Sequence, residues 1–195
     1  MAKRADAMTT HYLDITVVPD LEASGPQIIG VLYGNLHEML VQKRVSNIGV
    51  SFPRYNLRPR AIGDVLRVHG RREDLVQLVV QDWLKGVRDH VRMTDVRPVP
   101  FGVKHRTVSR KQFKTNAERL RRRRMRRKGE TVDQAKQAIP STVERVPNLP
   151  YVHLKSRSTG QNFRLYIRLG PLQDTPREGT FNSYGLDGAA TIPWF

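Results

Sequence analysis

The sequence predicts an α+β fold, and three observations support that prediction. Residues 11–18, HYLDITVV, alternate apolar and polar side chains as a half-buried strand does. Residues 28–41 carry apolar side chains at helical spacing, and the preceding Pro26 suits a first helical turn. Short strand-like stretches follow at residues 48–52 and 65–68. With 38% hydrophobic residues in a chain of 195, enough apolar side chains are present to build a modest core.

The rest of the first half continues this alternation. We expect a helix over residues 72–80, a short helical piece over 83–90 and a strand over 91–99. The resulting order, β-α-β-β-α-β, is that of the ferredoxin-like unit. We therefore predict a ferredoxin-like domain over residues 11–100, preceded by a flexible tail at 1–10. The first helix should bury a stripe made of Ile28, Leu32, Leu36, Met39 and Leu40.

Residues 101–195 predict a smaller, divergent ferredoxin-like or α+β half. A basic extended segment at residues 104–112 leads into an arginine-rich helix at about 116–128. A short helix is expected at 131–139, where Pro140 stops it. Residues 151–155 and 163–168 then predict a β-hairpin joined by a polar loop.

The net charge is concentrated in one segment. The chain has 34 Lys and Arg residues against 18 Asp and Glu, which gives a net charge of +16. Residues 104–128 contain thirteen of these basic residues and a single acid, Glu118. Because the remainder of the chain is nearly balanced, the basic character belongs to one element, and its field attracts polyanions.

The arginine-rich helix has signals for both of its ends. Asn116 is a suitable N-cap, Glu118 suits the positive helix start, and Gly129 suits the end. Charge runs are often solvated tails, but these caps favour an ordered helix that binds nucleic acid. An ordinary A-form major groove is too narrow for a helix, so we expect insertion near the end of a short RNA stem, as in a hairpin. One arc of the helix carries Arg119, Arg122, Arg123, Arg126 and Arg127, with Arg121 and Arg124 opposite.

Several kinds of chemistry are excluded or disfavoured by composition. The chain has no cysteine, so disulfides and thiolate sites are excluded. Its six histidines form no HExxH motif, and its scattered carboxylates argue against a two-metal nuclease. We expect no metal and no cofactor. No apolar run approaches the ~20 residues that span a bilayer and no signal peptide opens the chain, so we expect a cytoplasmic protein without a membrane partner.

Metal-free RNA cleavage needs few protein groups, because the substrate's own 2′-OH can attack the neighbouring phosphate. A histidine with hydroxyl and basic groups would suffice. The pattern alone, however, favours His37 as a partly buried histidine satisfied by hydrogen bonds. Ser156 and Ser158 have the pattern of a polar turn, and Tyr184 that of a packing tyrosine. Pattern analysis alone therefore stops short of a mechanism.

Several motifs in one order add to this reading. HYLDI, IGVSFP, NAERLRRRRMRR, STGQNFRLYIR, SYGL and a terminal PWF together resemble the type I-F CRISPR-associated endoribonuclease family, over residues 10–195. The resemblance implies an enzyme that binds the CRISPR repeat stem-loop and cuts at the 3′ base of the stem without a metal. It implies a 2′,3′-cyclic phosphate end, and retention of the product as a subunit of the type I-F interference (Cascade) complex.

The resemblance also implies roles for single residues. The catalytic histidine matches His37 in Gly34-Asn-Leu-His, the ribose-orienting serine matches Ser156, and the active-site tyrosine matches Tyr184. Further RNA contacts are expected from the purine-reading pair Arg110 and Gln112, from the groove-helix arginines Arg123 and Arg127, from Ser158, and from Phe163, which stacks on the terminal base pair. Ala117 stands where the family's pattern has proline, which alters the helix start and not the chemistry.

Two rival functions stay open at this point. The chain could be a non-catalytic RNA-binding subunit of a ribonucleoprotein that uses the same basic helix. It could also be a DNA-binding regulator, since duplex DNA satisfies a basic helix electrostatically as well.

Overall fold

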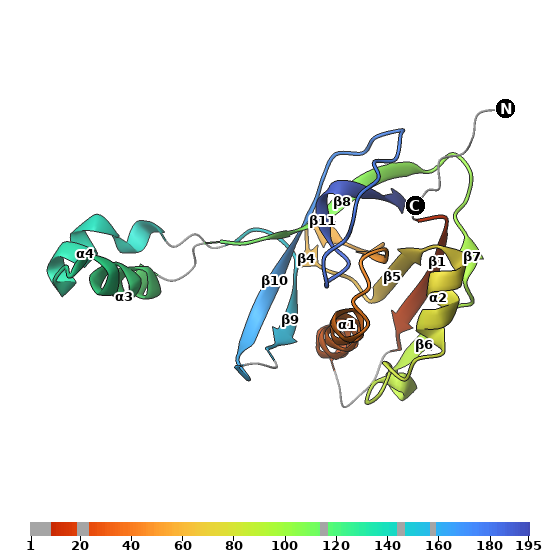
Figure 1. Ribbon diagram of the computed structural model, residues 1–195, viewed down its shortest axis with the longest axis horizontal. Helices are drawn as coiled ribbons and strands as arrows, with labels where there is room; N and C mark the ends of the chain where they lie inside the picture. The colour runs from red at the N-terminus through yellow and green to blue at the C-terminus, as the bar shows by residue number, and fades with distance from the viewer. Residues whose placement is uncertain (1–8, 19–23, 114–116, 144–146, 157–158) are drawn as a thin grey trace. The chain divides into compact units, whose positions relative to one another are not determined.

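The computed structural model describes residues 9–18, 24–113, 117–143, 147–156 and 159–195 (Figure 1). The chain divides into two compact units, one made of residues 1–111 and 149–195 and the other of residues 112–148. The two larger β-sheets both belong to the first unit, so the expected division at residue 100 falls between two sheets of one compact unit. That division stays a proposal. Of the tail expected at 1–10, the first eight residues lie outside the described residues.

The first sheet confirms the ferredoxin-like prediction. Its neighbouring strands pair antiparallel in the order β2 (Gly49–Ser51), β5 (Val65–Gly70), β1 (His11–Val17) and β6 (Val91–Met93). Two helices connect the strands, α1 (Gly25–Gln42) after β1 and α2 (Arg72–Val79) after β5. With four strands taken in chain order as 1 to 4, the sheet order is 4-1-3-2, which is the split β-α-β pattern.

Two local expectations in this half were wrong, and one element was not predicted. The strand expected at 91–99 is broken into β6 and β7 (Arg97–Pro98), because the Thr94 hydroxyl, rather than a backbone carbonyl, accepts the N–H of Asp14. The helical piece expected at 83–90 is reduced to the 3₁₀ turn η1 (Arg88–His90). A small hairpin was not expected at all, and it pairs β3 (Asn56–Leu57) with β4 (Arg60–Ala61).

The second sheet has the same strand order as the first. It pairs β11 (Asp187–Trp194), β8 (Lys104–Lys111), β10 (Asn162–Leu169) and β9 (Tyr151–Lys155), again antiparallel and again 4-1-3-2 in chain order (Figure 1). The expected hairpin is present as β9 and β10. Strand β11 was missed because small residues and Pro193 are poor strand formers, and its ladder with β8 is irregular between Asp187 and Ile192.

Helix α1 joins the two sheets through one core. The predicted stripe is confirmed, since all five of its side chains are buried. Ile29, Gly30 and Tyr33 are buried in addition, because α1 contacts β9 of the second sheet as well as β1 and β5 of the first. One continuous cluster of buried apolar side chains therefore includes both sheets, from Leu13 to Ile192.

The second unit contains the arginine-rich segment. Its helices are α3 (Ala117–Lys128) and α4 (Val132–Ala138), followed by the 3₁₀ turn η2 (Ser141–Val143). The Thr131 hydroxyl accepts the N–H of Gln134, and the Gln134 side chain accepts the N–H of Thr131, so α4 begins with a capping box. The expected N-cap of α3, Asn116, lies outside the described residues.

Candidate active site

His37 is the half-buried histidine that the helical pattern predicted. A hydrogen bond and an aromatic stacking contact fix the position of its ring. Its Nδ1 donates a hydrogen bond to the Ser183 carbonyl oxygen at 2.7 Å. A carbonyl can only accept, so Nδ1 carries the proton, and in the neutral ring Nε2 keeps its lone pair. The Tyr184 ring stacks flat on the imidazole, with centroids 3.7 Å apart and planes 6° apart. This geometry presents Nε2 as a base.

Residues 182–186 form the turn that brings Ser183 and Tyr184 to α1. The Asn182 side-chain oxygen accepts the N–H groups of Tyr184 and Leu186, and the Asn182 carbonyl accepts the N–H of Gly185. Gly185 has a φ of +67°, and a Cβ there would lie 2.5 Å from Cγ2 of Val50. The turn therefore needs glycine at this position for two independent reasons.

Tyr184 is a protonated phenol in this environment. Desolvation by burial raises the pKa of its hydroxyl, and the positive charge of Arg110 opposes that rise. Burial raises the pKa of Tyr33 further, with the neighbouring Tyr184 adding to the rise and Arg110 again opposing it. Both phenols can thus donate hydrogen bonds at neutral pH.

Ser156 lies directly after β9, in the turn toward β10. Its N–H donates to the Gln161 carbonyl at 2.8 Å, and its hydroxyl oxygen accepts the N–H of Thr159 at 3.3 Å. A Cβ on Gly30 would lie 2.4 Å from the carbonyl oxygen of His153, so β9 is seated directly on the α1 backbone. Gly30, Gly34 and His37 share one face of α1, and β9 therefore runs along the helix face that carries His37.

Arg110 and Phe163 belong to the same side of the second sheet. The guanidinium carbon of Arg110 lies 5.8 Å from the centroid of the Phe163 ring. The charge of Arg110 also opposes the rise in the pKa of Tyr33 and Tyr184, so this arginine lies near both phenols as well as near Phe163. Gln112 is exposed and begins the second unit, and Ser158 lies outside the described residues.

Helix α3 has two kinds of arginine. The five arginines of the predicted arc, Arg119, Arg122, Arg123, Arg126 and Arg127, are all exposed. Arg121 and Arg124 are half-buried within their unit. Arg121 donates to the Ile139 carbonyl and the Ser141 hydroxyl, and Arg124 forms a two-pronged ion pair with Glu130. On the arc, Arg122 also pairs with Glu118 at 3.7 Å, and all five arginines present their charge to solvent.

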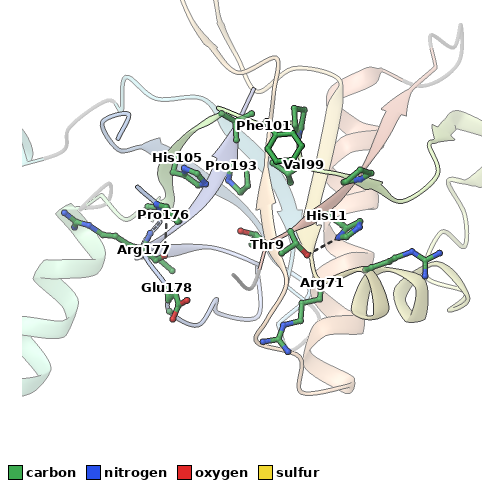
Figure 2. A pocket seen from close by; sticks show the side chains of 18 of the residues that line it. Thr9, His11, Arg71, Val99, Phe101, His105, Pro176, Arg177, Glu178 and Pro193 are labelled. Carbon is green, nitrogen blue, oxygen red and sulfur yellow. Dashed lines mark hydrogen bonds between the residues drawn. The ribbon is translucent and has the colours of Figure 1, made fainter. Parts of the chain in front are cut away.

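A groove of about 980 Å³ lies elsewhere on the first unit (Figure 2). Thr9 and His11, the segment around Val99 and Phe101, and the loop at Arg177 line it, and none of the expected site residues does. Among the described residues, no three His, Asp or Glu side chains gather where they could hold a metal ion. No helix within the described ranges is long and apolar enough to cross a membrane.

Some residues of the site were not expected from the sequence. Tyr33 donates its hydroxyl to the Tyr184 carbonyl at 2.7 Å, and Asn182 organises the turn. For Tyr33, the sequence held one signal. It lies four positions before His37 and hence on the same helix face. Asn182 could have been noted as a turn former ahead of Gly185.

Comparison with known proteins places these features in a family. The family model described as CRISPR-associated protein (Cas_Csy4) matches residues 12–195. The chain is 47% identical over 185 residues to the CRISPR-associated endonuclease Cas6/Csy4 of Pseudomonas aeruginosa (strain UCBPP-PA14), covering 95% of this chain and 99% of that protein. It is 41% identical over 185 residues to the protein of the same description from Escherichia coli (strain UTI89 / UPEC), with the same two coverages. The resemblance inferred from the motifs is thereby confirmed: this chain belongs to the Cas_Csy4 family of CRISPR-associated proteins, and it is an endonuclease.

Proposed function

We propose that this endonuclease binds the stem-loop of a CRISPR repeat transcript in the cytoplasm and cuts it at the 3′ base of the stem, without a metal. The observation that carries the proposal is the His37 ring, whose Nδ1 proton is held by the Ser183 carbonyl while Nε2 keeps its lone pair. A base in this state can take up the proton of a ribose 2′-OH. Two relatives described as CRISPR-associated endonucleases support the choice of substrate.

The chemical step uses a nucleophile that RNA itself supplies. Nε2 of His37 accepts the 2′-OH proton, and the 2′-oxygen attacks the adjacent phosphorus. The bond from phosphorus to the 5′-oxygen of the next nucleotide breaks, and that oxygen takes a proton from water, while the hydroxide left behind takes the proton now on His37. The product ends in a 2′,3′-cyclic phosphate. Ser156 and Tyr184 hold the scissile nucleotide so that the 2′-oxygen and the leaving oxygen stand in line.

RNA binding is divided between the two units. The exposed arc of α3, made of Arg119, Arg122, Arg123, Arg126 and Arg127, neutralises stem phosphates, and bidentate guanidinium contacts reach bases where the groove opens. Arg110 and Gln112 read purines low in the stem, Phe163 stacks on the terminal base pair, and Ser158 adds a further contact. After cutting, the protein keeps the hairpin and joins the other subunits of the type I-F interference (Cascade) complex.

The decisive experiment is cleavage of the repeat hairpin with EDTA present. Wild-type protein is expected to cut, and His37→Ala to bind the hairpin with unchanged affinity while cutting about 10²–10⁴-fold more slowly, the usual contribution of a general base. A hairpin with 2′-deoxyribose at the scissile nucleotide should bind and resist cutting. Hairpin binding with no cutting by the wild type would instead indicate a non-catalytic RNA-binding subunit, and preference for duplex DNA would indicate a regulator.

A further inference from the structure

Three consecutive carbonyls of the turn that contacts His37 are each hydrogen-bonded to a different donor. The Ser183 carbonyl accepts from His37 Nδ1, the Tyr184 carbonyl accepts from the Tyr33 hydroxyl, and the Gly185 carbonyl accepts from the Val50 N–H, at 2.7, 2.7 and 2.8 Å. The first two donors stand four positions apart on one face of α1. We propose that Tyr33 is a positioning residue for the reaction, which fixes the orientation and tautomer of His37 through the backbone of Tyr184; this inference rests on the general-base role proposed for His37.

The backbone geometry explains how one hydroxyl can act on a ring it does not touch. The Ser183 carbonyl belongs to the peptide plane before the Tyr184 Cα, and the Tyr184 carbonyl belongs to the plane after it. Each plane is rigid, so holding both carbonyls fixes φ and ψ of Tyr184 together. The direction of the Tyr184 side chain is then set, and its ring lies flat on the imidazole. Without the Tyr33 hydrogen bond, α1 holds only the first plane, and the second plane keeps only the bond from the Gly185 N–H to the Asn182 carbonyl.

The environment of Tyr33 keeps its hydroxyl protonated and leaves its ring little room to move. Its side chain is fully buried, and its ring meets Phe52 edge-on with centroids 5.4 Å apart. Burial raises the pKa of its hydroxyl well above the ordinary value, so the phenol keeps its proton. A buried hydroxyl needs a partner, and the Tyr184 carbonyl is that partner.

A second tyrosine in the same unit supplies a matched control. The Tyr55 hydroxyl donates to the carbonyl of Ile167 on β10 at 3.2 Å, away from the turn that contacts His37. Tyr55→Phe and Tyr33→Phe each remove one oxygen and one O–H···O=C hydrogen bond, and each leaves the aromatic ring in place. Tyr33 is fully buried and Tyr55 only partly, so a role limited to core packing predicts unequal losses of stability for the two variants but an unchanged His37 tautomer in both.

The test combines single-turnover cleavage of the repeat hairpin with ¹⁵N NMR of the His37 imidazole in the free protein at pH 8.5, where the two neutral tautomers give different nitrogen shifts. Wild type and Tyr55→Phe are expected to show the Nδ1–H tautomer and cleavage rates within twofold of each other. Tyr33→Phe is expected to show a mixture of tautomers and to cut about 5- to 20-fold more slowly at saturating protein, which corresponds to loss of roughly one hydrogen bond. Hairpin affinity should stay within twofold for all three proteins.

The inference is overturned if Tyr33→Phe keeps a pure Nδ1–H tautomer, whatever its cleavage rate, because slower cutting would then come from packing. It is also overturned if Tyr55→Phe changes the tautomer equally. Failure of the proposed function has a separate signature, since His37→Ala would then cut at the wild-type rate.

Discussion

His37 and the arginine arc of α3 are held in opposite ways. His37 lies half-buried against a turn whose neighbouring carbonyls are anchored by α1 and β2, and Tyr33 beneath it is fully buried. Among the twelve residues of α3, all of which the structure describes, Ala117 alone is buried, and the arginines of the arc are exposed. Catalysis depends on position within fractions of an ångström, whereas phosphate binding depends on charge and reach.

This difference predicts a separation of effects. Changes that move the support of His37 should alter the cleavage rate while leaving hairpin affinity nearly intact. Changes on the arc of α3 should alter affinity and its salt dependence while leaving the rate at saturating protein nearly intact. The variants below test the separation, from the largest expected effect to the smallest.

The largest effect is expected at the contact between α1 and β9. A methyl group on Gly30 would overlap the His153 carbonyl oxygen, whereas one on Gly34 would stand 3.9 Å from Leu154. Gly30→Ala should therefore displace β9 and lower the free energy of unfolding by about 1–3 kcal/mol, with slower cleavage. Gly34→Ala should raise the free energy of unfolding by about 0.5–1 kcal/mol, since alanine is the better helix former. Urea unfolding of both variants measures these stabilities. Equal values would contradict the close contact of β9 with the backbone of α1.

Acidification should destabilise the unit that carries His37. Buried His69, bonded through Nε2 to the Ser51 hydroxyl, has a pKa lowered to about 3, chiefly by desolvation. The unfolded chain binds a proton near pH 6.5 and the folded chain does not, so stability is complete above that pH and falls as the pH drops toward 3. At pH 5 the loss from this histidine should be about 2 kcal/mol.

The control for this pH dependence is His69→Gln, whose amide can still bond Ser51 but does not titrate. Its unfolding free energy should fall less between pH 7 and pH 5 than that of the wild type. The arginines of α3 stay charged throughout this range, so hairpin affinity of the folded protein should not show the same loss. Parallel pH curves for the two proteins would show that His69 is not the group responsible.

Features that depend on residues close together in the sequence could be predicted, whereas contacts between distant segments could not. The buried stripe of α1 and the exposed arc of α3 both follow from a 3.6-residue period, and both were predicted correctly. The hydrogen bonds of His37 and Tyr33 to residues 183 and 184 join positions more than 140 residues apart. No periodicity marks such contacts, and for that reason the helical pattern alone favoured a structural histidine, and only the family resemblance suggested a catalytic one.

The split of the arginines on α3 was likewise visible from spacing, but its cause was not. The wheel placed Arg121 and Arg124 opposite the arc, and the structure adds their partners in the same unit, Ile139, Ser141 and Glu130. The farthest of these partners, Ser141, lies 20 positions after Arg121, beyond the range of a helical pattern.

A smaller effect, on affinity, is expected at Arg123. Arg123→Ala should weaken hairpin binding about 5- to 30-fold at moderate salt, as expected for one phosphate or base contact, without slowing cutting at saturating protein. The slope of log affinity against log salt should fall by roughly one contact. Unchanged affinity at low salt would show that this part of α3 does not enter the groove.

The smallest effect is expected at Arg124, on the other side of the same helix. Its guanidinium is paired with Glu130, whose pKa this arginine holds below the usual value, so its charge is already partly neutralised inside the unit. Arg124→Ala should change hairpin affinity less than Arg123→Ala does and leave the salt slope nearly unchanged. Its main effect should be faster amide exchange in α4, because α3 loses its link to Glu130, two positions before that helix begins. If the two variants lowered the salt slope equally, the division of α3 into a packing side and a binding side would be wrong, and the whole helix would be a uniform phosphate-binding surface.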